Sequence, residues 1–370
     1  MSRHDLELVK LRKVYPGGTV AVDAFDLQVE KGEFISFVGP SGCGKTTTLR
    51  MIAGLESISG GDLLIRGRNF TQVPTEQRPT ATIFQNYAIF PHMSVRENIA
   101  FGLQVRKLAQ SEIDRRVDAI IEKLELGDVA HARESALSGG QKQRLALGRG
   151  LVTEPEILLL DEPLGALDAN LRKTIQEELK ILQRELGITF VFVTHAQSEA
   201  LSMGDRVVVM NAGRVEQISP PFELYTRPRS AFVARFIGRN KMIEGTLREG
   251  REGGLAALDT RFGTLAGLPG YAEDTAPAPG TPAYVVVPSE YVEIHPGDAP
   301  QGDTETDTVS GKVTALDPVG QLAYLTVHLD DRLQIRLETH RSRIDTTHIA
   351  PGNTVQLRWN PKRASIVTKD

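Results

Sequence analysis

Short apolar runs alternate with stretches of helical periodicity along the first two thirds of the chain. The runs Phe34–Val38, Thr80–Phe84, Ile157–Leu160 and Phe190–Val193 have the length of strands buried on both faces. Within Ile113–Leu124, apolar residues recur three and four positions apart, which indicates an amphipathic helix. This alternation predicts an α/β domain built on a parallel sheet.

Further patterns fill in this domain. Leu6–Val14 alternates apolar and charged residues and is typical of an edge strand. We expect a helical insertion over about 87–150, because Asn86–Ile99 turns helical and Ser111-x-x-Asp114 is a capping signature. Asp168 caps a later helix that Gly187 ends, with an apolar face formed by Leu171, Ile175, Leu179, Leu182 and Leu186.

Short β runs dominate the remainder of the chain. The α/β domain, residues 1–238, is expected to end near Gly238, which leaves 239–370 as a second, all-β domain. Gly267–Pro282 is rich in glycine, alanine and proline and is predicted to be an exposed loop. The remaining turn clusters separate strands, as in a small barrel or sandwich. The predicted strands are Ala283–Val287, Tyr291–His295, Thr308–Leu316, Leu322–Leu329, Leu333–Leu337 and Thr354–Trp359.

Composition narrows the class of protein. The 370 residues carry a formal charge of −4, so charge does not suggest a nucleic-acid partner. No apolar run approaches the roughly 20 residues that span a bilayer, and the start of the sequence lacks a signal-peptide core. Any membrane association is therefore expected to come through a partner. The only cysteine, Cys43, excludes an intrachain disulfide and fits a reducing cytosol.

A phosphate-binding loop follows the first apolar run. Residues 39–46 read Gly-Pro-Ser-Gly-Cys-Gly-Lys-Thr, which fits G-x-x-x-x-G-K-[ST] between a strand and a helix. The glycines let backbone N–H groups surround the β- and γ-phosphates, Lys45 neutralises their charge, and Thr46 offers an oxygen to Mg²⁺. ATP and Mg²⁺ are the expected cofactors.

Two further motifs lie in 137–168. Leu137-Ser138-Gly139-Gly140-Gln141 is a glycine-rich turn before a helix, where exposed N–H groups and the positive helix end form a seat for phosphate. Asp161 and Glu162 follow a buried strand, at the edge where a parallel sheet binds its ligands.

Three motifs, in their order along the chain, resemble those of the ATP-binding-cassette (ABC) ATPases, the motors of membrane transporters. They are the phosphate loop, LSGGQ, and LLLDEP with Gly165-Ala-Leu-Asp168. The resemblance implies a P-loop NTPase core with a helical insertion. The C-terminal strands resemble the OB-like (TOBE-type) extension of importer ATPases. Val287-Pro288-Ser289-Glu290 matches that extension's Arg-Pro-Glu only in part, and Ala196, Gly148 and Gly150 replace the family's usual aspartate and alanines.

The resemblance also assigns roles to residues. Glu162 is the expected general base, His195 the switch histidine that positions the γ-phosphate, and Gln85 the glutamine that approaches Mg²⁺ and water. Asp161 holds Mg²⁺ through water, together with Thr46 and Gln85. Tyr15 is expected to stack on adenine, and Asp168 belongs to the D-loop. The expected ATP-binding residues are Tyr15, Gly39, Pro40, Ser41, Gly42, Cys43, Gly44, Lys45, Thr46 and Thr47. The signature residues expected to act in trans, on the nucleotide of a second copy, are Ser138, Gly139, Gly140 and Gln141.

The resemblance therefore predicts an ATPase subunit of an importer at the cytoplasmic face of the inner membrane. Its expected partners are a second copy of itself, separate permease subunits and, indirectly, an extracytoplasmic solute-binding protein, with no nucleic acid. Tyr87, Phe90 and Met93 are candidates for the wall of a groove that receives a permease helix. The alternatives are a soluble ABC-type ATPase without transport, or a nucleotide-binding regulator. Residues 75–78, 90–92 and 236–242 look most like polyamine-importer ATPases, with ferric iron, sulfate and sugar importers as rivals.

Overall fold

The computed structural model describes residues 4–369, except 166, 239, 250–253, 272–275, 301–305, 343 and 345–348. The chain divides into two compact units, Met1–Pro221 and Phe222–Asp370. The boundary expected at Gly238 falls inside the second unit, and the behaviour of a fragment that ends there stays a prediction. None of the helices in the described residues combines the length and hydropathy that crossing a bilayer requires.

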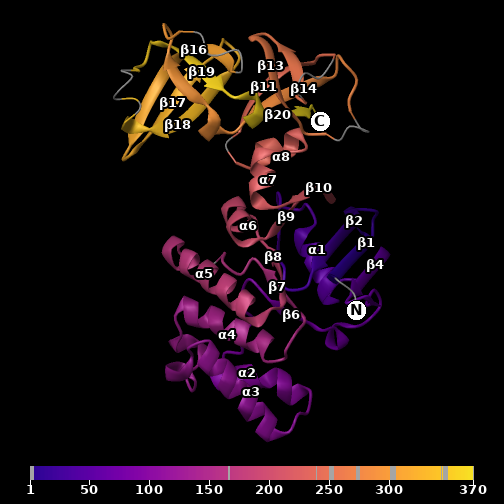
Figure 1. The fold of residues 1–370 in the computed structure, drawn as a ribbon. Coiled ribbons are helices and arrows are strands. Elements are labelled where there is room, and N and C mark those ends of the chain that lie inside the picture. Colours follow the sequence, from indigo (N-terminus) through magenta and orange to yellow (C-terminus); the bar gives the residue numbers. More distant parts are fainter. Residues whose placement is uncertain are drawn as a thin grey trace. The chain divides into compact units, whose positions relative to one another are not determined.

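A six-stranded sheet in the order β10-β9-β3-β8-β7-β6 forms the centre of the first unit (Figure 1). β6, β7, β8, β3 and β9 run parallel, and β10 returns antiparallel beside β9. Every residue of β3 and β8 is buried, which explains their continuous apolar sequences. The strands are β3 (Phe34–Val38), β6 (Thr80–Ile83), β7 (Ile157–Asp161), β8 (Thr189–Val193), β9 (Arg206–Asn211) and β10 (Arg214–Ser219).

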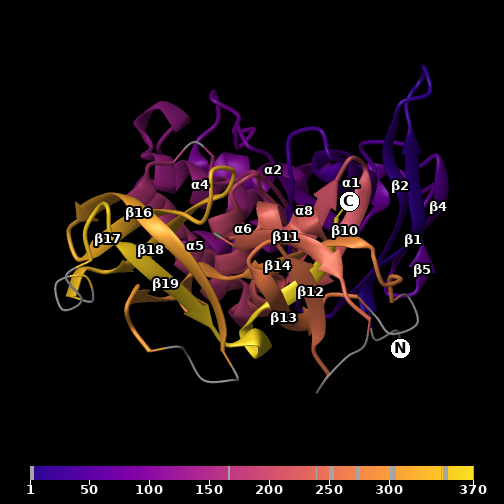
Figure 2. The ribbon, with the colours of Figure 1, turned by 90° about the horizontal axis from the view of Figure 1, so that it is seen from above.

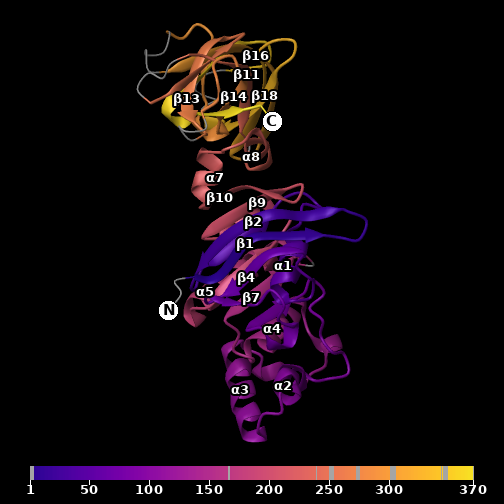
Figure 3. The same cartoon turned by 90° about the vertical axis from the view of Figure 1, so that its right-hand side faces the viewer.

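A second, antiparallel sheet in the order β2-β1-β4-β5 lies beside α1 (Figure 3). Its strands are β1 (His4–Val14), β2 (Val20–Glu30), β4 (Gly60–Ile65) and β5 (Arg68–Asn69), and α1 is Lys45–Ala53. The prediction of an edge strand over Leu6–Val14 was wrong, because β1 pairs with both β2 and β4. Alternation in the sequence reveals one buried face but not how many edges of a strand are paired.

Three helices form the part of the unit furthest from β9 and β10 (Figures 1 and 3). They are α2 (Val95–Val105), α3 (Gln110–Lys123) and α4 (Gly139–Leu151), and they contact one another. α5 (Ala169–Leu186) and α6 (Gln197–Met203) complete the helices of this unit among the described residues. The 3₁₀ turns of the described chain are Thr75–Gln77, Gly127–Val129, Glu134–Ala136, Ser289–Tyr291 and Pro361–Arg363.

The helix expected over Asn86–Ile99 begins only at Val95. Tyr87 and Ala88 have φ angles of 60° and 47°, in the left-handed region that a right-handed helix excludes. Turns continue until Ser94, whose side chain accepts from the N–H group at the third helical position in a capping box.

The capping signature predicted at Ser111 was also wrong. α3 begins at Gln110, and its N-cap is Ala109, which offers no side-chain hydrogen bond. Asp114 instead accepts a hydrogen bond from Gln110, with 3.0 Å between Oδ1 and Nε2. A serine-x-x-acid pattern that starts at the second helical residue is indistinguishable in sequence from one that starts at the N-cap.

The amphipathic faces predicted for α3 and α5 are confirmed. On α3, Ile113, Val117 and Ile121 are buried, and Leu124 is buried just beyond the helix. α5 is capped by Asp168 and ends at Gly187, whose φ of 61° is left-handed. Its buried apolar residues are Ile175, Leu179 and Leu182, while Leu171 and Leu186 are partly buried.

Close packing accounts for the two glycines in α4. A Cβ atom built on Gly148 would lie 3.1 Å from methyl groups of both Ile120 and Leu124. One built on Gly150 would lie 3.1 Å from a methyl group of Ile83 and 3.3 Å from one of Leu158. These separations are shorter than ordinary van der Waals contact, so α4 lies nearer its neighbours than a helix with alanine would.

The second unit joins a closed barrel of strand order β11-β12-β13-β20-β14 to a five-stranded sheet of order β15-β19-β16-β17-β18 (Figure 2). One core, which includes Leu258, Val285, Leu325 and Trp359, contains residues of both. The strands are β11 (Lys241–Leu247), β12 (Ala256–Thr260), β13 (Gly263–Pro269), β14 (Pro282–Val287), β15 (Glu293–Pro296), β16 (Asp307–Val319), β17 (Leu322–His328), β18 (Gln334–His340), β19 (Thr354–Trp359) and β20 (Ser365–Thr368).

The sequence patterns missed β11, β12, β13 and β20. Gly267–Pro269, predicted to start a loop, belongs to β13, while residues 272–275 of that loop lie outside the described residues. α7 (Pro221–Thr226) and α8 (Ala231–Phe236) precede the barrel. Ala231 and Ala234 pack against Val286 and Val367 of the barrel, so α8 belongs to the second unit.

Candidate nucleotide site

Four adjacent parallel strands deliver the predicted site residues to one edge of the sheet. The phosphate loop follows β3, and Thr194 and His195 follow β8. Asp161 is the last residue of β7, and Glu162 follows it. Gln85 follows β6. Because the carboxyl ends of parallel strands meet at one edge, residues far apart in the sequence come together there.

The phosphate loop is preorganised by glycine. Gly42 and Gly44 have φ angles of 78° and 101°, which residues with a side chain rarely adopt. A Cβ atom at Gly39 would lie 2.2 Å from the carbonyl oxygen of Met210, so only glycine fits there. The loop leads directly into α1, whose N-terminal N–H groups suit an anion.

Lys45 is held within this loop. Its Nζ donates to the carbonyl oxygens of Gly39 at 2.7 Å and of Pro40 at 3.0 Å. Cys43 is 2% exposed and packs in the apolar core, and its sulfur accepts a hydrogen bond from Lys45 Nζ at 3.6 Å. Ser41 is exposed, while Thr46 and Thr47 are partly exposed.

Thr46 and Asp161 form the oxygen pair expected for a divalent cation. Thr46 Oγ1 lies 3.4 Å from Asp161 Oδ1. Burial, and next the charge of Glu162, raise the pKa of Asp161. A hydroxyl and a carboxylate suit Mg²⁺, which takes its remaining ligands from phosphate and water. The described residues contain no cluster of three or more histidine, cysteine or acidic side chains that would replace those ligands. The residues present therefore fit Mg²⁺ bound with a nucleotide.

Glu162 and His195 face each other from neighbouring strands. Glu162 Oε2 lies 3.2 Å from His195 Nδ1, and the His195 side chain is 62% exposed. Glu162 has a φ of 47°, and its N–H donates to the carbonyl of Val193 at 3.0 Å, which fixes the backbone where β7 ends. A strained backbone at a carboxylate beside a phosphate loop is typical of a functional position.

Gln85 and Tyr15 are two further predicted site residues. Gln85 is exposed in the turn after β6. Tyr15 is half-buried, its hydroxyl donates to Glu56 at 3.3 Å, and the Lys13 ammonium lies 5.0 Å from the centre of its ring. A stacked adenine would therefore share this ring with a cation. Adenine stacking by Tyr15 stays a prediction.

The signature lies at the exposed start of α4. Ser138 is the N-cap, and Gln141 N–H donates to its Oγ at 3.3 Å while Gln141 Oε1 accepts from Ser138 N–H at 2.9 Å. This capping box leaves Ser138 and Gly139 exposed. These two residues lie at the start of a helix, where backbone N–H groups suit an anion. This place is separate from the edge of the sheet that carries the phosphate loop. Asp168, the D-loop residue, is exposed and caps α5 by accepting from the N–H groups of Asn170 and Leu171.

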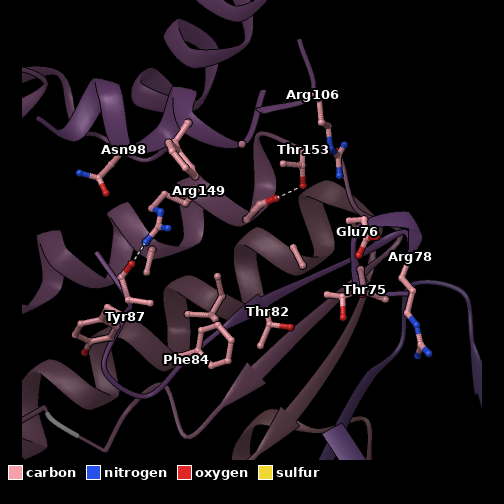
Figure 4. A pocket seen from close by; sticks show the side chains of 18 residues that line it. Thr75, Glu76, Arg78, Thr82, Phe84, Tyr87, Asn98, Arg106, Arg149 and Thr153 are labelled. Atoms are coloured by element: carbon pink, nitrogen blue, oxygen red, sulfur yellow. Dashed lines mark hydrogen bonds between the residues drawn. The ribbon is translucent and has the colours of Figure 1, made fainter. Parts of the chain in front are cut away.

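A pocket of about 290 Å³ opens beside the turn that follows Gln85 (Figure 4). Tyr87 lies towards one end, and Glu76 and Arg106 lie towards the other. Of the three wall candidates, Tyr87 lines the pocket, whereas Phe90 and Met93 are not among its lining residues. Phe90 instead packs on Phe101, with 4.7 Å between ring centres.

Sequence reasoning missed a clamp between this turn and α4. The Arg149 guanidinium lies 4.4 Å from the centre of the Phe90 ring and donates to the carbonyl of Ala88. Burial lowers the pKa of Arg149. The available signal was an arginine on an otherwise apolar helix face, and such a residue has no partner that can be read from sequence.

Comparisons with known proteins give the same assignment as the geometry. The family model described as ABC transporter matches residues 22–165, and a TOBE domain matches 285–367. The spermidine/putrescine import ATP-binding protein PotA of Thermobifida fusca is 42% identical over 370 residues, which covers 98% of this chain and 93% of the relative. Its counterpart from Rubrobacter xylanophilus is 43% identical over 354 residues, 95% of this chain and 90% of the relative.

The chain belongs to the ATP-binding subunits of ABC importers. This membership confirms the predicted P-loop core, the OB-like C-terminal domain and the ATPase activity, and nothing supports an ABC protein without a transporter.

Solved structures agree on the core. cbiO1 from Clostridium perfringens, part of the ABC transporter complex cbiONQ, is 29% identical with a TM-score of 0.56, covering 60% of this chain and 91% of that protein. The ATP-binding cassette MJ0796, solved as a dimer with ADP and Pi, is 30% identical with a TM-score of 0.52. The match covers 58% of this chain and 98% of that protein.

Proposed function

We propose that this chain hydrolyses ATP to drive the uptake of polyamines of the spermidine and putrescine class through separate membrane subunits. The observation that carries this proposal is similarity over both units: relatives named as spermidine/putrescine import proteins align with 95–98% of the chain. The nucleotide core alone is common to importers of many solutes. An alignment that also includes the C-terminal domain is more informative about the transport system.

Transport by the reconstituted complex tests the substrate. The subunit, its copurifying permease and the cognate binding protein are placed in liposomes containing ATP, and uptake of labelled spermidine, putrescine, sulfate, ferric ion and maltose is compared. We expect ATP-dependent uptake of a polyamine. Uptake of one of the other solutes without polyamine uptake would reassign the system, while leaving the ATPase assignment intact.

ATP is proposed to bind on the phosphate loop, with the loop amides and Lys45 on the phosphates. Lys45 exchanges its bonds to the carbonyls of Gly39 and Pro40 for phosphate oxygens, which form stronger charge-assisted hydrogen bonds. Tyr15 is proposed to stack on adenine. Thr46 and Asp161 would hold Mg²⁺, with Asp161 acting through water, and the ion when bound would neutralise charge on the β- and γ-phosphates.

Glu162 is proposed as the general base that takes a proton from the attacking water. Its 3.2 Å contact with His195 supports this role, because the imidazole fixes the orientation of the carboxylate. His195 would also position the γ-phosphate, and Gln85 would approach the ion and the water. These side chains act mainly by position and charge, as is usual for phosphoryl transfer.

The complete site is proposed to need two copies of the chain. The signature residues Ser138, Gly139, Gly140 and Gln141 would close over the γ-phosphate bound by the partner copy. The exposure of Ser138 and Gly139 at the start of α4 supports this arrangement, since an outward-facing helix start is accessible to a phosphate held by another copy. Closure of the dimer would then move the helices α2, α3 and α4.

The permease subunits are proposed to dock at the pocket beside Tyr87. Its lining combines aromatic side chains with arginines at its margin, which suits an amphipathic helix of a membrane protein. Docking there would hold the chain at the cytoplasmic face of the membrane, and the extracytoplasmic binding protein would act through the permease. Loss of copurification when Tyr87 is changed to Asp, with ATP binding retained, tests this location.

A further inference from the structure

A buried hydrogen-bonded group fixes the backbone on both sides of His195. Thr194 is 1% exposed and Glu199 is 6% exposed. The Thr194 hydroxyl donates to Glu199 Oε2 at 2.5 Å and accepts from the N–H of Ala196 at 3.0 Å. Ala196 is the N-cap of α6 and offers no side-chain cap, and the Thr194 hydroxyl instead fixes the backbone N–H of this N-cap residue.

The other oxygen of Glu199 faces α5. Glu199 Oε1 lies 3.5 Å from Nε of Arg172. A buried carboxylate is costly unless a charge compensates it, and Arg172 supplies that charge. The same guanidinium donates through Nη2 to the carbonyl of Leu167 at 2.9 Å. A continuous set of polar contacts therefore runs from Leu167, beside the D-loop, to the histidine loop.

Leu167 in turn packs beside the signature. A Cβ atom built on Gly139 would lie 3.5 Å from Cδ2 of Leu167, so the Leu167 side chain lies next to this glycine. Leu167 is 7% exposed, so it has little room to move independently. A side chain or ligand that moved the signature toward α5 would therefore meet the residue whose carbonyl accepts from Arg172.

We propose that Arg172, Glu199 and Thr194 are positioning residues that couple the two ATP sites of the dimer. The inference rests on the proposed two-copy site, in which the signature of a copy contacts the partner's nucleotide while His195 faces its own. Binding at the partner's site then moves Leu167, and the contacts through Arg172, Glu199 and Thr194 place His195 for hydrolysis. Coupling of this kind is a difference in free energy between two arrangements of the same contacts.

The test measures hydrolysis against ATP concentration by the subunit in complex with its permease. Thr194→Val removes the hydroxyl while keeping the shape, and Arg172→Met removes the charge. For each we expect kcat to fall on the order of tenfold and the Hill coefficient to fall toward about 1. Affinity for a fluorescent ATP analogue should stay within about twofold, because the phosphate loop is untouched. Thr194→Ser should restore both kinetic values.

Lys180→Met is the matched control. Lys180 also joins α5 to α6, because its Nζ donates to the carbonyl of Ser202 at 2.8 Å, but this contact is at the end of α6 away from His195. We expect its kcat and Hill coefficient to match those of the wild type. The Thr194→Val, Arg172→Met double variant should lose no more than the worse single variant, since both interrupt one set of contacts.

Three results would overturn the proposal. If the wild type is cooperative and the variants at Thr194 and Arg172 keep its kcat and Hill coefficient, these residues do not couple the sites. The proposed two-copy site would not be affected by that result. Losses equal to those of Lys180→Met would indicate only a general effect of loosening α5 from α6. A wild-type complex that hydrolyses ATP without cooperativity would leave no coupling to explain, whereas the two-copy site is tested separately by Ser138→Arg.

Discussion

His195 Nδ1 lies 3.2 Å from Glu162 Oε2, so the carboxylate at the end of β7 is oriented by the imidazole at the end of β8. The two residues are 33 positions apart in the numbering but follow adjacent parallel strands. The contact leaves the other carboxylate oxygen, Oε1, available for a water molecule. It therefore supports Glu162 as base and His195 as its positioning partner.

Replacing Glu162 by Gln should lower kcat by roughly 10²–10⁴-fold, because the amide keeps the shape but cannot accept a proton. ATP affinity should change little, since Lys45 and the loop amides remain. Steady-state hydrolysis and equilibrium binding of a fluorescent ATP analogue measure the two effects. Glu177→Gln, at an exposed position on α5, is the control and should hydrolyse normally. Activity within about threefold of wild type would exclude Glu162 as the base.

Ser138→Arg should block dimer closure without preventing ATP binding. The arginine side chain would occupy the seat for the partner's γ-phosphate, whereas the phosphate loop of the same copy is unchanged. In the Glu162→Gln background, closed dimers should accumulate with ATP, and adding Ser138→Arg should return the protein on a sizing column to its nucleotide-free state. Lys45→Ala, for comparison, should lose binding itself. If Ser138→Arg abolished binding as fully as Lys45→Ala, the signature would act in cis.

Gly148→Ala should lower the free energy of unfolding by about 1 kcal/mol. Alanine gains up to about 1 kcal/mol of helix propensity, but a Cβ at 3.1 Å from Ile120 and Leu124 forces both to move, and overpacking costs about 1–3 kcal/mol. Denaturant unfolding of the first unit measures the net change. Gly148→Ala combined with Ile120→Ala should cost less than the sum of the two single variants, because alanine at position 120 removes the Cγ2 methyl group that the new Cβ would meet. A gain in stability from Gly148→Ala alone would contradict the packing argument.

Asp307→Asn should flatten the pH dependence of the second unit's stability. Burial raises the pKa of Asp307 to about 6, and its Oδ2 accepts from the N–H of Ala266 at 2.8 Å. The folded state thus keeps a proton that the unfolded chain loses at lower pH, so this stabilisation is complete below about pH 4 and is lost as pH rises through about 6.

Asparagine stays neutral, so at pH 7 it should stabilise the unit by on the order of 1 kcal/mol, an amount reduced by partial exposure to solvent. The midpoint of thermal unfolding between pH 4 and 7 measures this. Asp317→Asn, an exposed position on the same strand, is the control and should leave the pH profile unchanged. If the unfolding midpoint of Asp307→Asn depended on pH as steeply as that of the wild type, Asp307 would not be the source of the pH dependence.

The sequence was sufficient where a local pattern determines the structure. The phosphate loop, the buried strands and the caps at Asp168 and Gly187 depend on residues close together in the chain. It was insufficient where the structure depends on pairing between distant segments, as with β4, the second partner of β1. The partners of Arg149 and Arg172 likewise lie on other elements, so neither role could be read from spacing. In the second unit, strands such as β12 were missed because alternation is weak in segments rich in alanine and glycine.

β20 closes the barrel of the second unit by pairing with β13 in parallel and with β14 antiparallel. These pairings join residues near 366 to residues near 269 and 285, so the barrel stays open until its last strand has left the ribosome. The first unit has no such requirement beyond residue 221. During synthesis we expect the ATPase core to fold first, while β11, β12, β13 and β14 pair with one another and the edges of β13 and β14 that face β20 stay open. Ribosomes that stall within the last strands would release a chain with a formed nucleotide site and an open, aggregation-prone sheet edge.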